Sequence, residues 1–274
     1  MSYPAYRCFD LVGRSDAILE VLLKSERKGN PFGQAFWEEM PVLFEAITAD
    51  ESVRAVILAT DGPHFSYGLD LIGLSSQLMP AVSGGFAGRR AIQELGKRMQ
   101  LGFDLVANCP KPVIAAVNGW CIGAGVELIA ACDIRVCSQD AKFSLREVKL
   151  GMVPDLGGIQ RVPLLIGEGH MRQMALTGED VSADRAAAMG LVNSVHGTAQ
   201  EAREAARSIA AKIASNPPRV VAGVKEVLNA RSSALVADSL RHALMLNTSL
   251  MQSDDFKEAV TAFMERREPV FKGK

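Results

Sequence analysis

Short apolar runs separated by helical patterns constrain the fold of this chain more than any other feature. Residues 17–23 (AILEVLL) and 53–60 (VRAVILAT) predict two strands. Residues 32–48 between them carry apolar side chains at helical spacing, so Pro41 must kink this helix or lie near one of its ends. A strand, a helix and a second strand in this order predict a βαβ crossover.

The same alternation continues further along the chain. Two more strands and a helix between them are predicted at residues 111–119, 134–138 and 126–133. The series indicates a mainly parallel sheet covered by helices. From residue 199 the pattern is helical almost throughout, with an Asn-Pro-Pro break at 216–218. We therefore predict an α/β core over residues 1–198 and a helical C-terminal region over residues 199–274.

Composition and charge exclude several classes of partner. The chain has 274 residues, 48% of them hydrophobic, and a formal net charge of -1. These values are typical of an ordinary globular protein without a basic surface, so we expect neither nucleic acid nor a membrane surface as a partner. No apolar run reaches membrane-spanning length. Residues 79–90 (MPAVSGGFAGRR) are the one segment whose glycines predict a flexible loop, which would be able to move over a site.

The cysteines predict a reducing environment. Their number is odd, they form no CxxC pair, and most lie in apolar runs: Cys8, Cys109, Cys121, Cys132 and Cys137. This distribution favours reduced, buried thiols over disulfides or a zinc site, and we predict no metal. The N-terminal residues MSYPAYRCFD lack the pattern of a signal peptide, so a cytoplasmic location is the expectation.

Two glycine-containing turns are candidates for binding an anionic oxygen. In residues 118–133 (NGWCIGAGVELIAACD), Gly123 and Gly125 lie where a turn opens a helix, so backbone N–H groups and the helix dipole would favour an anion there. Leu128 occupies the third glycine position of a dinucleotide motif, which this stretch therefore does not match. Glycines that only permit close helix packing are an equal alternative. In residues 64–71 (HFSYGLDL), the chain turns at a glycine and leaves the next N–H free.

Three acidic residues in apolar surroundings are candidates for acid–base chemistry. Glu127 falls in the first turn of an apolar helix, Glu147 follows a strand-like segment, and Asp155 lies in a Pro-Asp loop. Each has a structural alternative: a helix-dipole contact for Glu127, an ion pair with Arg146 or Lys149 on a wet face for Glu147, and an N-cap or Asx turn for Asp155. Local sequence does not show whether the three meet in space.

Residues 111–167 resemble the central signature of the crotonase, or enoyl-CoA hydratase/isomerase, superfamily. Their sequence is KPVIAAVNGWCIGAGVELIAACDIRVCSQDAKFSLREVKLGMVPDLGGIQRVPLLIG. The similarity runs from the HFSYGLDL turn through residues 175–195 (ALTGEDVSADRAAAMGLVNSV) to the tail AFMERREPVFKG, about four fifths of the chain. It implies an α/β spiral of ββα units with a C-terminal helical trimerisation region. The expected assembly is a homo-oligomer, either a trimer or a dimer of trimers.

The resemblance also implies a substrate and an oxyanion hole. Members of this family bind an acyl-CoA thioester and hold its enolate with two backbone N–H groups, which by position are those of Leu69 and Ala124. Many members have glycine at the second position, but the donor is backbone in either case. No cofactor is implied, because CoA is part of the substrate. Phe263 and Arg266 match positions that contact CoA across a subunit boundary, although a solvated basic tail is an equal alternative.

The acids distinguish the reactions of this family. Glu127 and Glu147 match the pair with which enoyl-CoA hydratases activate water, whereas dienoyl-CoA isomerases carry a third acid at the place of Asp155. The resemblance therefore favours a Δ3,5-Δ2,4-dienoyl-CoA isomerase in which Glu147 takes a proton from C2 and Asp155 supplies one to C6. An enoyl-CoA hydratase is the alternative, and a non-catalytic crotonase-like oligomer is a third hypothesis.

Overall fold

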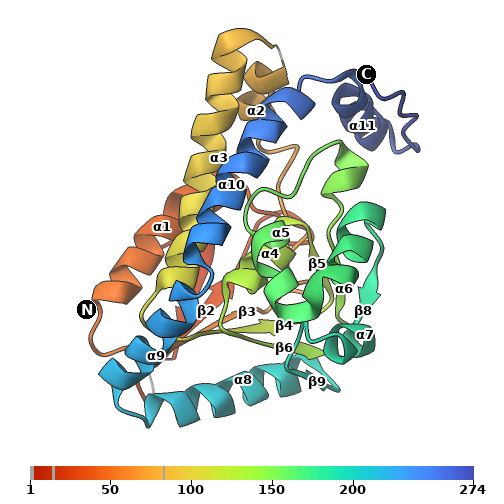
Figure 1. Ribbon diagram of the computed structural model, residues 1–274. Helices are drawn as coiled ribbons and strands as arrows, with labels where there is room; N and C mark the ends of the chain where they lie inside the picture. The colour runs from red at the N-terminus through yellow and green to blue at the C-terminus, as the bar shows by residue number, and fades with distance from the viewer. Residues whose placement is uncertain (1–2, 14–15, 83) are drawn as a thin grey trace.

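The computed structural model describes residues 3–13, 16–82 and 84–274 (Figure 1). Its main sheet has the strand order β1-β2-β3-β4-β6-β9. The strands span Phe9–Val12 (β1), Ile18–Leu23 (β2), Ala55–Thr60 (β3), Val113–Val117 (β4), Ile134–Ser138 (β6) and Ser194–His196 (β9). All neighbouring pairs are parallel except β1 with β2, which is antiparallel. The predicted parallel sheet is confirmed, and the edge strand β1 is an addition to it.

A second, smaller sheet carries part of the site. Its three strands are β5 (Trp120–Ile122), β7 (Lys142–Ser144) and β8 (Val181–Ser182), in the order β5-β7-β8. The strand-like segment expected before Glu147 is β7, whereas β5 and β8 were not predicted, because strands this short show no alternation of apolar and polar residues. The segment with the HFSYGLDL turn joins β5 through a parallel bridge between Ser66 and Cys121. This bridge brings the turn next to the helix that follows β5.

Helices cover both faces of the main sheet. Those before residue 199 are α1 (Gln34–Ala49), α2 (Ser75–Val82), α3 (Gly85–Asn108), α4 (Ala124–Ala131), the 3-10 helix η1 (Glu147–Leu150), α5 (Gly158–Arg161), α6 (Pro163–Thr177) and α7 (Ala183–Ala188). Pro41 lies well inside α1 rather than near an end. The main core contains side chains of α1, α3 and α4 together with one face of the strands. It fixes the helices that form the walls of the site.

Four helices follow the core: α8 (Ala199–Ala214), α9 (Pro218–Ala230), α10 (Ser233–Leu250) and α11 (Asp254–Glu265). Helix α8 runs along the outer face of the sheet, where Ala206 and Ala210 pack against Ile57 and Ile114 (Figure 1). Helix α10 lies beside α3, and the absence of a side chain at Gly96 makes room for Leu244 there. The predicted break before α9 is confirmed. The division into a core and an oligomerisation region stays a prediction.

The predicted flexible loop at residues 79–90 is wrong. Most of this segment is helical, in the end of α2 and the beginning of α3, and Ser83 lies outside the described residues. Gly84 and Gly85 have φ angles of +80° and +74°, values that glycine adopts at little cost. These glycines therefore begin α3 rather than forming part of an extended loop.

The predicted burial is confirmed for four of the five cysteines. All five are free thiols, and all but Cys8 are buried. Within the described ranges, no helix is long and apolar enough to cross a membrane.

Candidate active site

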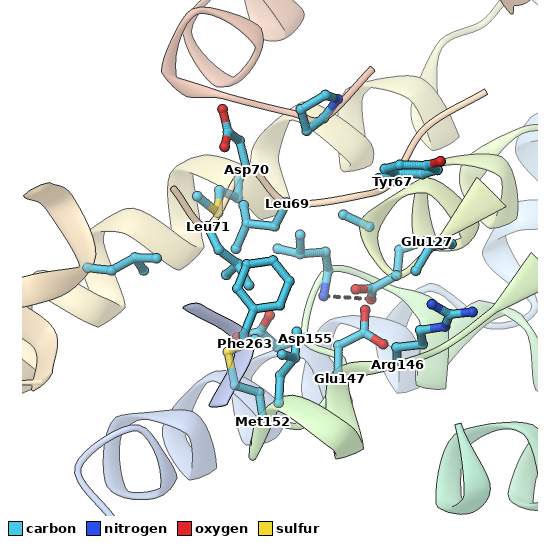
Figure 2. A pocket seen from close by; sticks show the side chains of 18 of the residues that line it. Tyr67, Leu69, Asp70, Leu71, Glu127, Arg146, Glu147, Met152, Asp155 and Phe263 are labelled. Carbon is cyan, nitrogen blue, oxygen red and sulfur yellow. Dashed lines mark hydrogen bonds between the residues drawn. The ribbon is translucent and has the colours of Figure 1, made fainter. Parts of the chain in front are cut away.

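One cavity of about 960 Å³ brings together every residue that the sequence indicated for the site (Figure 2). Its walls come from the turn after β3 and from α3, α4, η1, α10 and α11. The predicted residues on its walls are Leu69, Ala124, Glu127, Glu147, Asp155, Phe263 and Arg266. Residues far apart along the chain thus share one pocket.

The two predicted oxyanion donors lie next to each other because of Gly68. This residue has a φ of +81°, and a Cβ atom on it would lie 2.6 Å from the carbonyl oxygen of Ile122 and 3.1 Å from the nitrogen of Ala124. The backbone of the turn therefore touches the start of α4, an approach that only glycine permits. The N–H of Gly68 is used locally, donating to Ser66 Oγ at 2.9 Å. The next N–H along the turn, that of Leu69, donates to no other described residue.

Ala124 supplies the second N–H from the first turn of α4. N–H groups in the first turn of a helix have no intrahelical acceptor, and this one bonds to no other described residue. The turn is made by Gly123, whose φ is +53°, whereas Ala124 itself is not among the residues with positive φ. Alanine at this position therefore adds no backbone strain, and two unpaired N–H groups lie on the wall of the pocket.

Glu127 is buried and fixed to the loop that carries Asp155. Its side chain is only 1% exposed, and its Oε2 accepts hydrogen bonds from the N–H groups of Leu156 at 2.9 Å and Gly158 at 2.7 Å. Figure 2 draws one of these bonds as a dashed line. Burial raises its pKa well above the usual range, and the nearby Glu147 and Asp155 add to the effect. A contact with the helix dipole alone does not explain these bonds, so Glu127 also holds the loop in place.

Glu147 is a buried carboxylate with an oxygen that no described residue satisfies. It begins η1 and is 8% exposed, and its buried Oε2 has no hydrogen-bond partner in the described chain. Arg146 pairs with Asp180 at 2.6 Å instead, which excludes the expected alternative of an ion pair with this arginine on a wet face. Burial is the largest cause that raises the pKa of Glu147, to about 7, and Asp155 adds to it.

Asp155 also points into the pocket rather than capping a helix. The N-cap of α5 is Gly157, so the N-cap alternative for Asp155 is excluded. Its Oδ2 accepts a hydrogen bond of 2.7 Å from Asn247 Nδ2, and its backbone carbonyl accepts one of 2.7 Å from Gln100 Nε2. Burial raises the pKa of this carboxyl to about 6, although the bond from Asn247 opposes the rise.

Phe263 and Arg266 lie on the wall of their own chain's pocket. Both come from the C-terminal end of α11, where Arg266 ends the helix in a left-handed conformation with a φ of +56°. The family resemblance implies that these two positions contact CoA bound to a neighbouring subunit. In the single chain, α11 folds back over the pocket of the same chain. The next residue, Arg267, pairs with Glu258 and Glu265. Residues 263–268 are all exposed, so the contact with CoA and the solvated basic tail both stay predictions.

Sequence reasoning missed several residues of the pocket. Asn247 and Gln100 hold Asp155, and the ring of Trp120 lies 5.1 Å from both the Lys142 ammonium and the Arg146 guanidinium. One signal for Asn247 was present, since it is an isolated amide in the apolar stretch ALMLNTSL. Among the described residues, no group of three or more His, Cys, Asp or Glu side chains is placed to hold a metal ion.

Comparisons with known proteins agree with this geometry. The family model described as "Enoyl-CoA hydratase/isomerase" matches residues 13–274. A Delta(3,5)-Delta(2,4)-dienoyl-CoA isomerase of Dictyostelium discoideum is 35% identical over 94% of this chain and 88% of its own length. A peroxisomal protein of the same name from Arabidopsis thaliana is 35% identical over 99% of both chains. The crystal structure of an enoyl-CoA hydratase from Mycobacterium avium subsp. paratuberculosis superposes with a TM-score of 0.83 at 27% identity, covering 98% of this chain and 100% of that one.

Carboxyl groups beside two free backbone N–H groups are an arrangement suited to acid–base chemistry and to binding an anionic oxygen. The chain belongs to the enoyl-CoA hydratase/isomerase family, and it is an enzyme of that family. The crotonase-like fold is confirmed. The hypothesis of a non-catalytic oligomer is not supported.

The predicted cytoplasmic location is wrong by the same comparisons. The Dictyostelium relative is named mitochondrial and the Arabidopsis relative peroxisomal. Reduced thiols are compatible with any reducing compartment. Targeting signals are recognised by receptors and do not depend on the fold or the overall composition. Composition and cysteine use therefore did not determine the compartment.

Proposed function

We propose that the protein is a Δ3,5-Δ2,4-dienoyl-CoA isomerase. The observation that carries the proposal is Asp155, a third carboxyl, half-buried, in the pocket that also holds the buried Glu127 and Glu147. It lies beside the apolar wall formed by Leu244 of α10 and by Met251 just after this helix, because Asn247 between them binds its carboxylate. An acyl chain would extend along such a wall, away from the thioester. Relatives of the same name at 35% identity support the proposal.

The reaction moves one proton along the acyl chain. The thioester carbonyl accepts hydrogen bonds from the N–H groups of Leu69 and Ala124, which stabilise the enolate by about 3 kcal/mol for each donor. Ionised Glu147 removes a proton from C2, the electron pair shifts through the diene, and protonated Asp155 delivers a proton to C6. Glu147 then holds the proton and Asp155 is ionised, and exchange with water restores both. The reaction is redox-neutral, so we propose no cofactor beyond the CoA of the substrate.

The raised pKa values make this proton transfer feasible near neutral pH. With pKa values of about 7 for Glu147 and about 6 for Asp155, both carboxyls titrate close to the pH at which they must work. The productive form has Glu147 ionised and Asp155 protonated. Burial raises the pKa of both carboxyls, so each of them can take up or release a proton near neutral pH.

Hydration of 2-enoyl-CoA is the second candidate, and one observation favours it. The carboxylates of Glu127 and Glu147 are turned toward each other in the pocket, the arrangement that would hold one water between them (Figure 2). Asp155 has no role in that reaction. The two candidates therefore differ in their dependence on one residue.

An assay with both substrates decides between them. The parent protein should isomerise 3,5-dienoyl-CoA, and Asp155→Asn should abolish this while leaving any hydration of 2-enoyl-CoA largely intact. Asp238→Asn is the control, because Asp238 is an exposed acid on α10 outside the pocket. In heavy water the parent should place deuterium at C6 of the product. Rapid hydration by a parent that ignores the diene would replace the isomerase by the hydratase.

We also propose that CoA binds near Phe263 and Arg266, which line the pocket.

We propose, in addition, that the chain forms a trimer or a dimer of trimers. Support for self-association comes from α9, where four exposed apolar side chains follow helical spacing: Val220, Val224, Val227 and Leu228. Val224→Lys should shift the mass measured by light scattering toward the monomer. Leu176→Lys, a change at an exposed leucine of α6, is the matched control.

A further inference from the structure

Asn247 is an isolated polar group on the apolar face that α10 presents to the pocket. Leu244, Asn247 and Met251 follow one another at helical spacing and all line the cavity. Asn247 is only 2% exposed, so its amide must find its hydrogen bonds inside the protein. Unlike Leu244 and Met251, it contributes little apolar surface to the pocket. Its amide instead forms hydrogen bonds with the segment around Asp155.

The amide of Asn247 is fully engaged with the loop that carries Asp155. Its Oδ1 accepts the N–H of Val153 at 3.0 Å, and its Nδ2 donates to the carbonyl of Val153 at 2.8 Å. The second hydrogen of Nδ2 goes to Oδ2 of Asp155 at 2.7 Å. The two backbone bonds fix the plane of the amide, so the third bond has a defined direction.

We propose that Asn247 is a positioning residue for the proposed proton transfer: it occupies Oδ2 of Asp155 and leaves Oδ1 to carry the proton to the substrate. Oδ1 accepts no hydrogen bond from another described residue. This inference rests on the proposed function for the role of Asp155 but concerns a residue of the C-terminal helices. Helix α10 thereby sets the geometry of a group that belongs to the α/β core.

The charged surroundings of Asp155 make the effect of this bond measurable. Glu127 on α4 and Glu147 on η1 are the titratable groups that interact with it electrostatically, and Arg266 of α11 lies on the same pocket wall. Helix α3 contributes the neutral Gln100. A hydrogen bond donated to a carboxylate favours its ionised form, so removing the bond raises the pKa of Asp155. The protonated form then persists to higher pH.

Asn247→Leu removes the donor with little change in volume. It should lower kcat roughly 10- to 100-fold with a smaller change in KM, since the proton donor is misplaced rather than the substrate. The pH optimum of kcat/KM should shift to more alkaline values. Gln100→Leu is the matched control, because it removes a bond to the Asp155 backbone and leaves the carboxylate bond in place. It should not move the pH optimum.

An infrared titration of the Asp155 carboxyl in the ligand-free protein, identified by difference from Asp155→Asn, gives a readout without turnover. Its pKa should rise in Asn247→Leu and remain at the parent value in Gln100→Leu. An unchanged Asp155 pKa in Asn247→Leu, or an equal shift in Gln100→Leu, would overturn the positioning role. A parent protein without isomerase activity would contradict the proposed function only, because the titration still reports on Asn247.

Discussion

The backbone nitrogen of Gly158 lies 2.7 Å from Oε2 of Glu127. This hydrogen bond joins α4, whose first residue is Ala124, to the segment that follows Asp155. The same oxygen accepts the N–H of Leu156 at 2.9 Å. Gly158 has no side chain, and a Cβ atom there would lie 3.0 Å from Cγ of Glu127. One carboxylate therefore serves both the chemistry and the architecture of the pocket.

Substitutions of Glu127 should separate these two uses. Glu127→Gln keeps an oxygen acceptor for the two N–H groups, whereas Glu127→Ala leaves both buried and unpaired. An unpaired buried donor costs about 1–3 kcal/mol, so Glu127→Ala should be less stable than Glu127→Gln by about 2–4 kcal/mol. Urea unfolding of both variants measures the difference. Equal stabilities would mean that Glu127 does not hold the loop.

Glu147→Gln should lose activity and gain stability. Removal of the base should lower kcat/KM for 3,5-dienoyl-CoA by roughly two to four orders of magnitude. The folded-state pKa of about 7 lies above the ordinary value of 4.5, so the parent loses stability as the pH rises through this range. At pH 8 the variant should be more stable by up to about 3 kcal/mol. Activity within tenfold of the parent would remove Glu147 from the mechanism.

The activity of the parent should follow a bell-shaped pH profile. Because the productive form has one proton shared between Glu147 and Asp155, kcat/KM should fall below a pKa of about 6 and above one of about 7. Initial rates between pH 5 and 9 at low substrate concentration measure both limbs. A flat profile over this range would show that neither carboxyl has to change its proton during turnover.

Gly68→Ala tests the oxyanion site. The new Cβ would meet the Ile122 carbonyl and the nitrogen of Ala124, so both donors should be displaced. Loss of one such donor lowers kcat by roughly 10²- to 10³-fold. Gly84→Ala is the control, since Gly84 has nearly the same φ of +80° but nothing within 4 Å of the added atom. Similar kinetics for the two variants would exclude a specific role of the turn.

Arg266→Ala tests the proposed CoA contact. The change should raise KM for CoA esters, and the difference from the parent should shrink as salt is added, because added ions screen an exposed charge. Arg267→Ala removes the same charge from a neighbouring residue that pairs with Glu258 and does not line the pocket. The same KM in parent and Arg266→Ala at low salt would place CoA elsewhere.

Local patterns in the sequence determined much of the fold. Strands β2, β3, β4 and β6 and the helices α1 and α4 were predictable because their apolar runs and spacings reflect burial on the same short stretch of chain. Helices α2 and α3, between β3 and β4, were not predicted. The candidate acids were recognisable as carboxylates in apolar surroundings, and the resemblance gave them expected roles. Strands β5 and β8 and the positive φ angles of Gly84 and Gly85 were not predictable, because single pairings and φ angles leave no periodic pattern.

Only the tertiary structure decided which of these residues meet. Glu127, Glu147 and Asp155 share a pocket because α4, η1 and the following loop pack against α10, and Asn247 reaches Asp155 from that helix. Their raised pKa values also belong to the folded state, since desolvation acts on a carboxyl only when distant parts of the chain enclose it. A sequence specifies the chemical groups and their local geometry, whereas long-range packing sets the distances and the burial on which their reactivity depends.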